Sequence, residues 1–163
     1  MINIVKGDIL STIKKFQKDN PNKTLIVIHQ ANCFNTLGKA RGIAGVLDKA
    51  YPQIAVADQA TIKGDKSKLG QFSKAKINEK LWIFNAYGQY KYGMSKDIVY
   101  TDYDALQNSL GLITTLVNSY IPNPVYLIPL YIGAGLANGN HDKILNEIIK
   151  PLFAQEELIL IYN

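Results

Sequence analysis

Glycine is concentrated in two short stretches of this sequence. Of its 12 glycines, three lie in residues 38–45 and three in residues 133–139. Glycine allows the backbone to turn its N–H groups toward an anion, and the helices expected to begin near Ile43 and Asn140 would add the partial positive charge of their N-termini. The two stretches could hold both phosphates of a pyrophosphate; two tight turns before helices are the alternative. Neither stretch contains a Walker A or G-x-G-x-x-G pattern.

Few side chains could carry out chemistry. His29 directly follows an apolar run, and a histidine can act as an acid, a base or a phosphate nucleophile near neutral pH. Arg41 is the single arginine beside 17 lysines, and a guanidinium can bind a phosphate through two hydrogen bonds. The alternatives are a core histidine and a solvated loop arginine. One cysteine, Cys33, excludes a multi-cysteine zinc site, and we expect neither a metal nor a cofactor.

Short apolar segments alternate with segments of helical period. Strands are expected at 2–6, 25–28, 70–77, 81–85, 125–128 and 158–162, and helices after Ser11 as N-cap, at 43–50, at 54–62, from 101 or 102 to 120, and from 140 or 141 to 152. This alternation predicts an α/β fold, a three-layer α/β/α sandwich with a mixed central sheet. Both glycine-rich stretches follow buried strands, so they should open onto the carboxyl edge of the sheet, where ligands bind in such folds.

Length and composition narrow the class of protein. The chain has 163 residues with 47% hydrophobic residues, which predicts a single domain over residues 1–163. It lacks an apolar run of the ~18 residues that a membrane span needs, so we expect a cytoplasmic protein without a membrane partner. The net charge of +5 comes from lysines spread along the chain. Scattered lysine is typical of a solvated surface and not of sequence-specific nucleic-acid binding, although it favours an anionic ligand.

Three motifs together resemble those of the macro domain family. They are Lys6–Leu10 (KGDIL), Leu25–Ala44 (LIVIHQANCFNTLGKARGIA) and Ile128–Ala137 (IPLYIGAGLA), and they occur in the family's order across essentially the whole chain. The chain is most similar to the branch that contains yeast ADP-ribose-1″-phosphate phosphatase, the terminal ADP-ribose glutamate hydrolases and phage-encoded macro proteins. The resemblance implies that the partner is ADP-ribose or a close derivative.

The resemblance also implies a role for individual residues. Asp8 would accept a hydrogen bond from the adenine amino group, with support from the Ile9 N–H, and Tyr162 would stack on the base. Asn32 would face the distal ribose. Helix capping, an Asx turn and sheet packing are the alternatives for Asp8, Asn32 and Tyr162. Backbone N–H groups would bind the phosphates from two sides: Gly42, Ile43 and Ala44 on one, and Gly133, Ala134, Gly135 and Leu136 on the other. Five tyrosines could line the distal-ribose end, or could simply pack there: Tyr87, Tyr90, Tyr92, Tyr100 and Tyr103.

The chain departs from the family pattern in its candidate catalytic groups. The lysine and the aspartate used by the glutamate hydrolases are replaced by Gln89 and Ala137, and the first loop, which contains Arg41, is two residues longer than in the phosphatase pattern. His29 stands where the phosphatases have their histidine. The sequence therefore favours hydrolysis of ADP-ribose-1″-phosphate, with His29 and Arg41 as catalytic residues. A non-catalytic reader of ADP-ribose or a derived signalling nucleotide is the first alternative. An ADP-ribosyl hydrolase acting on ADP-ribosylated protein or nucleic acid is the second.

Overall fold

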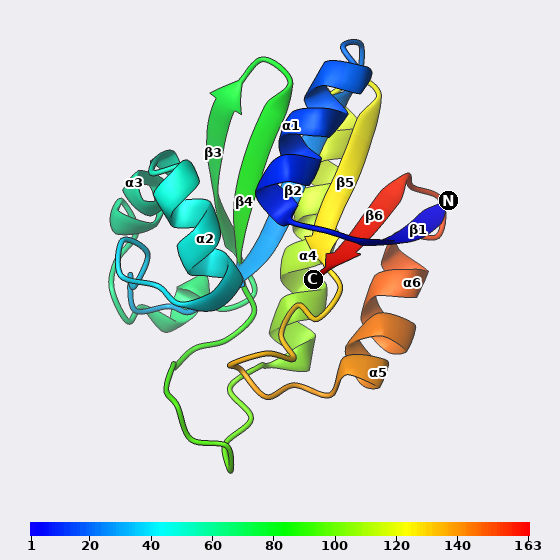
Figure 1. The fold of residues 1–163 in the computed structure, drawn as a ribbon. Coiled ribbons are helices and arrows are strands. Elements are labelled where there is room, and N and C mark those ends of the chain that lie inside the picture. Colours follow the sequence, from blue (N-terminus) through cyan, green and yellow to red (C-terminus); the bar gives the residue numbers. More distant parts are fainter.

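The computed structural model describes residues 1–163, and a six-stranded sheet runs through them (Figure 1). The strands are β1 (Ile2–Lys6), β2 (Thr24–Ala31), β3 (Phe72–Asn78), β4 (Leu81–Tyr87), β5 (Pro124–Pro129) and β6 (Leu158–Tyr162). Their order across the sheet is β1-β6-β5-β2-β4-β3. All neighbouring strands are parallel except β3, which runs antiparallel to β4.

Helices cover both faces of the sheet. One face packs against α1 (Ile9–Asp19), α2 (Gly42–Ala50) and α3 (Gln53–Gln59) through a core cluster that includes Ile13, Leu47 and Ile54. The other face packs against α4 (Tyr103–Tyr120) and a last helical stretch through a second cluster. In Figure 1, α1 crosses in front of the sheet and α4 lies behind it. The predicted three-layer α/β/α sandwich with a mixed sheet is confirmed.

The helix starts show where local sequence signals succeed. Asp102 and Asn140 cap α4 and the last helix as predicted, each accepting a hydrogen bond from a backbone N–H three residues later. The prediction of Ser11 as the first N-cap is wrong, because the helix begins at Ile9 and its cap is Asp8. Ser11 is instead the residue whose N–H and hydroxyl donate to the Asp8 carboxylate, at 2.8 and 2.9 Å.

The last helical stretch is irregular. It consists of α5 (His141–Lys143), a π-helical segment η2 (Ile144–Ile149) and α6 (Lys150–Leu152); a separate short 3₁₀ turn, η1, covers Lys66–Lys68. Pro151 lies in α6, two residues after the π segment ends, has no N–H to donate, and would clash with a preceding carbonyl in a regular α-helix. The wider π winding is one way for a helix to accommodate such a break.

Strands β2 and β5 position the candidate site. They are adjacent and parallel at the centre of the sheet, so the segments that follow them leave from the same edge. We call residues 32–41, after β2, loop 1, and residues 130–140, after β5, loop 2. No helix is both long and apolar enough to cross a membrane.

Candidate functional site

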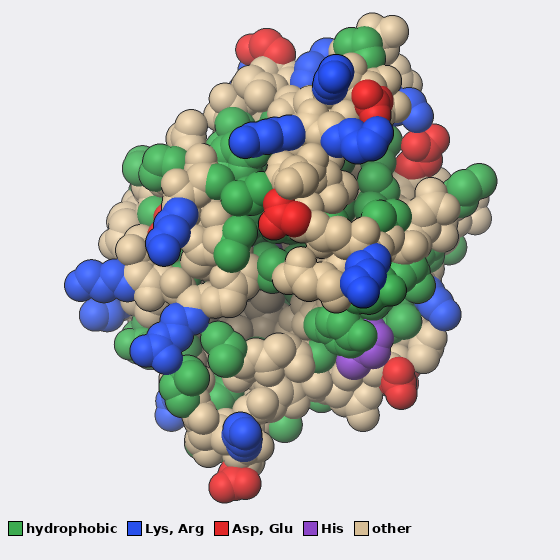
Figure 2. All heavy atoms as spheres, in the orientation of Figure 1, with side chains coloured by type: hydrophobic (Ala, Val, Ile, Leu, Met, Phe, Trp, Pro, Cys, Tyr) green, Lys and Arg blue, Asp and Glu red, His purple; other side chains and the backbone are tan.

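Loop 1 and loop 2 approach each other across the carboxyl edge of the sheet. A side-chain carbon placed on Gly42, at the end of loop 1, would lie 3.8 Å from Leu136 Cδ1 of loop 2. Figure 2 shows this face of the molecule hollowed between the segments that follow β2 and β5. The expected common opening of the two glycine-rich stretches is therefore present, and we call it the cleft.

The N-terminus of α2 presents unbonded N–H groups at the cleft. Arg41 is the N-cap residue of this helix, and its side chain makes no capping hydrogen bond. The first helical hydrogen bond runs from the Gly45 N–H to the Arg41 carbonyl, so the N–H groups of Gly42, Ile43 and Ala44 have no acceptor within the protein. These are the donors that the sequence assigned to the phosphates, and the helix dipole adds positive potential at the same place.

Loop 2 presents a second set of donors. The N–H groups of Gly133, Gly135 and Leu136 have no acceptor within the protein, whereas the Ala134 N–H donates to the Tyr131 carbonyl at 2.8 Å. Three of the four expected donors on this side are therefore available to a ligand. Gly133 has φ +71°, a left-handed conformation that side chains disfavour, so glycine is required for this turn.

Asp8 follows β1 at the same carboxyl edge of the sheet as the cleft, on its β1 side, because β1 is parallel to β6 and β6 to β5. Both hydrogen bonds from Ser11 go to Oδ2, so Oδ1 can accept from a ligand while the residue still caps α1. These two bonds hold the pKa of Asp8 below its ordinary value. The N–H of Ile9 is unbonded, as the first N–H groups of a helix are. Asp8 therefore caps the helix and keeps an acceptor and an adjacent donor for a base.

Tyr162 meets this end of the cleft through its backbone. Its carbonyl accepts from the Gly7 N–H at 2.8 Å, next to Asp8. Its side chain is partly buried against the core cluster on the face covered by α4, while α1 lies on the opposite face. The structure thus brings the Tyr162 backbone, and not its ring, beside Asp8.

Asn32 forms an Asx turn at the start of loop 1. Its Oδ1 accepts from the Phe34 N–H at 2.8 Å, and its Nδ2 donates to the Thr36 hydroxyl at 2.7 Å. The side chain is partly buried and positioned by both bonds. One amide hydrogen and one lone pair are left with which Asn32 could contact a ribose.

Two buried carboxylates accept hydrogen bonds from the backbone of loop 1. Asp58 accepts from the Leu37 N–H and from the Tyr87 hydroxyl, and Asp48 accepts from the Gly38 N–H at 2.6 Å. Sequence reasoning missed both residues. Asp58 lies four residues after the inward-facing Ile54 on α3, and this helical spacing is the signal that could have placed it inside.

His29 lies among these groups and is only 2% exposed. Its Nε2 is 2.6 Å from Asn85 Oδ1, and Asn85 Nδ2 donates to the Ile54 carbonyl and the Ser73 hydroxyl. Because both Asn85 amide hydrogens are used, Oδ1 is the acceptor and Nε2 carries the imidazole proton. The other ring nitrogen, Nδ1, is buried without a partner. Burial lowers the pKa of His29, so the ring is neutral at physiological pH.

Arg41 is the last residue of loop 1, directly before α2. It is exposed, and its nearest polar contact is Met94 Sδ, 4.0 Å from Nη1, on the long segment after β4. Tyr90 and Tyr92 of that segment make edge-to-face contacts with Phe34 of loop 1, with ring centroids 5.0 and 6.4 Å apart. Two of the five expected tyrosines therefore contact loop 1.

Cys33 and Gln89 are occupied by structural contacts. The Cys33 thiol is buried, its Sγ is 3.5 Å from the Gln89 carbonyl, and burial raises its pKa to about 11. Such a thiol is not a nucleophile near neutral pH. The Gln89 side chain accepts from Gln30 and donates to the Lys91 carbonyl.

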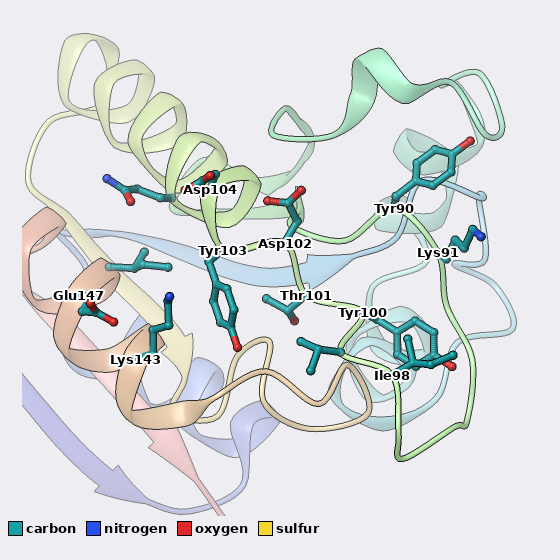
Figure 3. A pocket seen from close by; sticks show the side chains of 13 residues that line it. Tyr90, Lys91, Ile98, Tyr100, Thr101, Asp102, Tyr103, Asp104, Lys143 and Glu147 are labelled. Atoms are coloured by element: carbon teal, nitrogen blue, oxygen red, sulfur yellow. The ribbon is translucent and has the colours of Figure 1, made fainter.

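A separate cavity of about 900 Å³ lies on the α4 side of the segment after β4 (Figure 3). Three carboxylates line it, from Asp102, Asp104 and Glu147, together with two lysines, Lys91 and Lys143. Of the residues expected near ADP-ribose, it contains only three of the five tyrosines: Tyr90, Tyr100 and Tyr103. The carboxylates of the cavity outnumber its lysines, which does not favour a diphosphate, whereas the cleft offers unbonded N–H donors. The cleft is therefore the better candidate for an anion site.

Comparison with known proteins gives one relative in sequence and several in structure. No family model matches the chain. It is 30% identical over 165 residues to the uncharacterized 17.5 kDa protein in the tk–vs intergenic region of Enterobacteria phage T4, covering 99% of this chain and 96% of that protein. A protein of unknown function from Bacteroides thetaiotaomicron superimposes with a TM-score of 0.77 at 22% identity, covering 99% of this chain and 97% of the other.

Two further solved structures are a macrodomain of a DarG protein and a DarTG protein. The macrodomain of Mycobacterium tuberculosis DarG has a TM-score of 0.72 at 16% identity, covering 100% of this chain and 98% of that one. Thermosipho africanus DarTG, solved in complex with ADP-ribose, has a TM-score of 0.67 at 13% identity, covering 98% of this chain and 42% of that one. The chain therefore has the macrodomain fold and belongs to the same family as the 17.5 kDa protein of phage T4.

Proposed function

We propose that residues 1–163 form one macro domain whose cleft binds ADP-ribose or a close derivative. One observation carries the proposal: there are two sets of unbonded N–H groups, at the start of α2 and in loop 2, on two segments that approach each other at Gly42 and Leu136. Paired donors of this kind suit a diphosphate without a metal ion. The ADP-ribose complex of the Thermosipho africanus protein, which shares the fold, supports the same choice of ligand.

The residues along the cleft indicate the orientation in which ADP-ribose would bind. Asp8 and the Ile9 N–H supply an acceptor and a donor on the β1 side, which matches the amino group and ring nitrogen of adenine. Asn32 and Arg41 lie on loop 1. We therefore place the adenine beside α1, the diphosphate between the two loops, and the distal ribose next to Asn32.

Calorimetric titration with ADP-ribose, AMP and ribose-5-phosphate tests this arrangement. Asp8→Ala should weaken ADP-ribose binding by about 1–3 kcal/mol, because a hydrogen bond to a charged acceptor is lost. It should leave ribose-5-phosphate, which has no adenine, unchanged. Since Asp8 also caps α1, Asp8→Ser is the matched variant: serine can still cap the helix but is too short to reach a base.

Equal ADP-ribose affinity in the unaltered protein and both Asp8 variants would remove Asp8 from the site. Absence of ADP-ribose binding to the unaltered protein would overturn the proposed function itself.

Hydrolysis of ADP-ribose-1″-phosphate is the second candidate, and Arg41 is the observation that favours it. Its exposed guanidinium stands at the uncapped N-terminus of α2, where it could stabilise charge on a transferred phosphoryl group. His29 is buried beneath loop 1 with its Nε2 bonded to Asn85, so we propose that it supports the loop instead of contacting the phosphate. Its catalytic role stays a prediction of the sequence alone.

Release of phosphate from ADP-ribose-1″-phosphate separates these possibilities. We expect turnover that falls in Arg41→Gln and survives in His29→Gln. A fall of ~100-fold or more in His29→Gln would instead assign acid–base or nucleophilic chemistry to the histidine. Tight binding without turnover would make the protein a reader, and the same assay with ADP-ribosylated protein and nucleic acid tests the hydrolase alternative.

A further inference from the structure

Tyr100 and Thr101, which directly precede Asp102 at the start of α4, form hydrogen bonds to the backbone of loop 2. Tyr100 and Thr101 donate their N–H groups to the Ala137 carbonyl, at 2.8 and 3.3 Å. The Thr101 hydroxyl donates to the Gly133 carbonyl at 2.6 Å. Figure 3 shows Thr101 between the first turn of α4 and the ribbon of loop 2. Two loop 2 carbonyls are thus bonded by a segment that lies more than thirty residues earlier in the chain.

The direction of the Thr101 hydroxyl proton is determined by its surroundings. Thr101 is 5% exposed, so water does not compete for the hydroxyl. Its Oγ1 accepts from Gln30 Nε2 at 3.0 Å, and Gln30 Nε2 also donates to Gln89 Oε1 at 2.9 Å. With the oxygen used as an acceptor, the proton is directed to the Gly133 carbonyl.

The Gly133 carbonyl is held in place from a second side. It also accepts from the Gly139 N–H at 2.8 Å. A side-chain carbon on Gly139 would collide with this carbonyl oxygen, so the backbone at Gly139 packs directly against it. The carbonyl therefore points toward the buried Thr101 hydroxyl and the Gly139 N–H.

An anion site depends on this orientation. A carbonyl oxygen carries partial negative charge, so a peptide that turned its oxygen into the cleft would repel a phosphate. The Gly133 carbonyl belongs to the planar peptide unit that links Gly133 to Ala134, so the hydrogen bond from Thr101 holds the backbone directly beside the unbonded Gly133 and Gly135 N–H groups. We propose that Thr101 is a positioning residue for the phosphate-binding N–H groups of loop 2: its hydroxyl keeps the Gly133 carbonyl out of the cleft.

This inference rests on the proposed function and names a residue that does not itself contact the ligand. It predicts that losing the Thr101 hydroxyl weakens the binding of ligands that contain phosphate and not the binding of adenosine, because only the phosphate end of the site depends on loop 2. Thr101→Val removes the hydroxyl and keeps the shape of the side chain, whereas Thr101→Ser keeps the hydroxyl and removes the methyl group. Adenosine is the control ligand, since it has the base but no phosphate.

The experiment is an NMR titration of ¹⁵N-labelled protein with ADP-ribose and with adenosine, which also reports whether each variant is folded. We expect Thr101→Val to weaken ADP-ribose by about tenfold or more and adenosine by less than about twofold, and Thr101→Ser to bind both nearly as the unaltered protein does. Thr101→Ala replaces Thr101→Val where the valine variant is not folded.

Equal ADP-ribose affinity in folded Thr101→Val and in the unaltered protein would overturn the inference. So would an equal loss for ADP-ribose and adenosine, because it would indicate general loosening of the fold. Either result leaves the proposed function in place, whereas that function fails only if the unaltered protein does not bind ADP-ribose.

Discussion

The buried His29 predicts a specific dependence of stability on pH. The ring is 2% exposed, donates through Nε2 to Asn85, and has no partner at Nδ1. Charging it inside the protein would place an unbonded N–H and a positive charge in a dry environment, and this burial lowers the pKa of His29. The perturbation that tests this is acidification from pH 7.5 to pH 5.5.

The sign and size of the effect follow from proton linkage. The unfolded histidine has a pKa of 6.5, so below that pH the unfolded chain binds a proton that the folded chain does not. The stabilisation is therefore fully present above pH 6.5 and is lost as the pH falls toward the lowered pKa of the folded state. Each pH unit is worth at most about 1.4 kcal/mol, and while the native ring stays neutral the loss between pH 7.5 and 5.5 is about 1.4 kcal/mol.

Urea unfolding at the two pH values measures this loss. The unaltered protein should lose about 1.4 kcal/mol more than His29→Gln, because glutamine can donate to Asn85 but does not titrate. His141→Gln is the matched control and should behave like the unaltered protein, since His141 lies at a helix start away from the core. The same pH dependence in His29→Gln and in the unaltered protein would refute the assignment of a neutral buried ring.

Two further substitutions test the contacts that hold loop 1 and loop 2 in place. Asp58→Ala should lower the free energy of unfolding by about 2–4 kcal/mol in urea titrations, because the buried Tyr87 hydroxyl and a loop 1 N–H lose their acceptor; a loss below about 1 kcal/mol would contradict this. Gly139→Ala should cost more than about 2 kcal/mol and weaken ADP-ribose, because its methyl group would displace the Gly133 carbonyl. Gly135→Ala points into open space and should leave the thermal midpoint nearly unchanged, so equal melting of the two alanine variants would contradict the packing at Gly139.

The fold could be predicted because its signals are local. Apolar runs on both faces identified the central strands β2 and β5, and helix caps such as Asp102 and Asn140 marked their helices within a residue. The prediction failed at Ser11 because Asp8 and Ser11 are both good caps. Only the position of the first helical turn decides between them, and that turn depends on how β1 ends against β6.

Some parts of the candidate site could be predicted from the sequence, and others could not. Glycine marks the backbone that presents N–H groups, so both loops could be found. The role of Thr101 could not be predicted, because its partner Gly133 lies 32 residues away in the sequence. The burial of Asp58 could be inferred from its helical spacing to Ile54, but its bond to the Leu37 N–H, 21 residues away, could not. The position of His29 after a strand was visible, but its burial follows from the packing of α2 and α3 over β2, which short-range patterns do not specify.

The pairing of β1 with β6 has a consequence for how the protein is made. Strand β1 is translated well before its partner, residues 158–162, which follows only after the four other strands of the sheet. At about 5–20 residues per second, β1 waits on the order of 10–30 seconds before it can be incorporated. The hydrogen bond from Gly7 to Tyr162, which adjoins the Asp8 end of the cleft, is formed only after that. The central strands and both loops are therefore translated first, and the Asp8 end of the cleft can be completed only after residues 158–162 have been made.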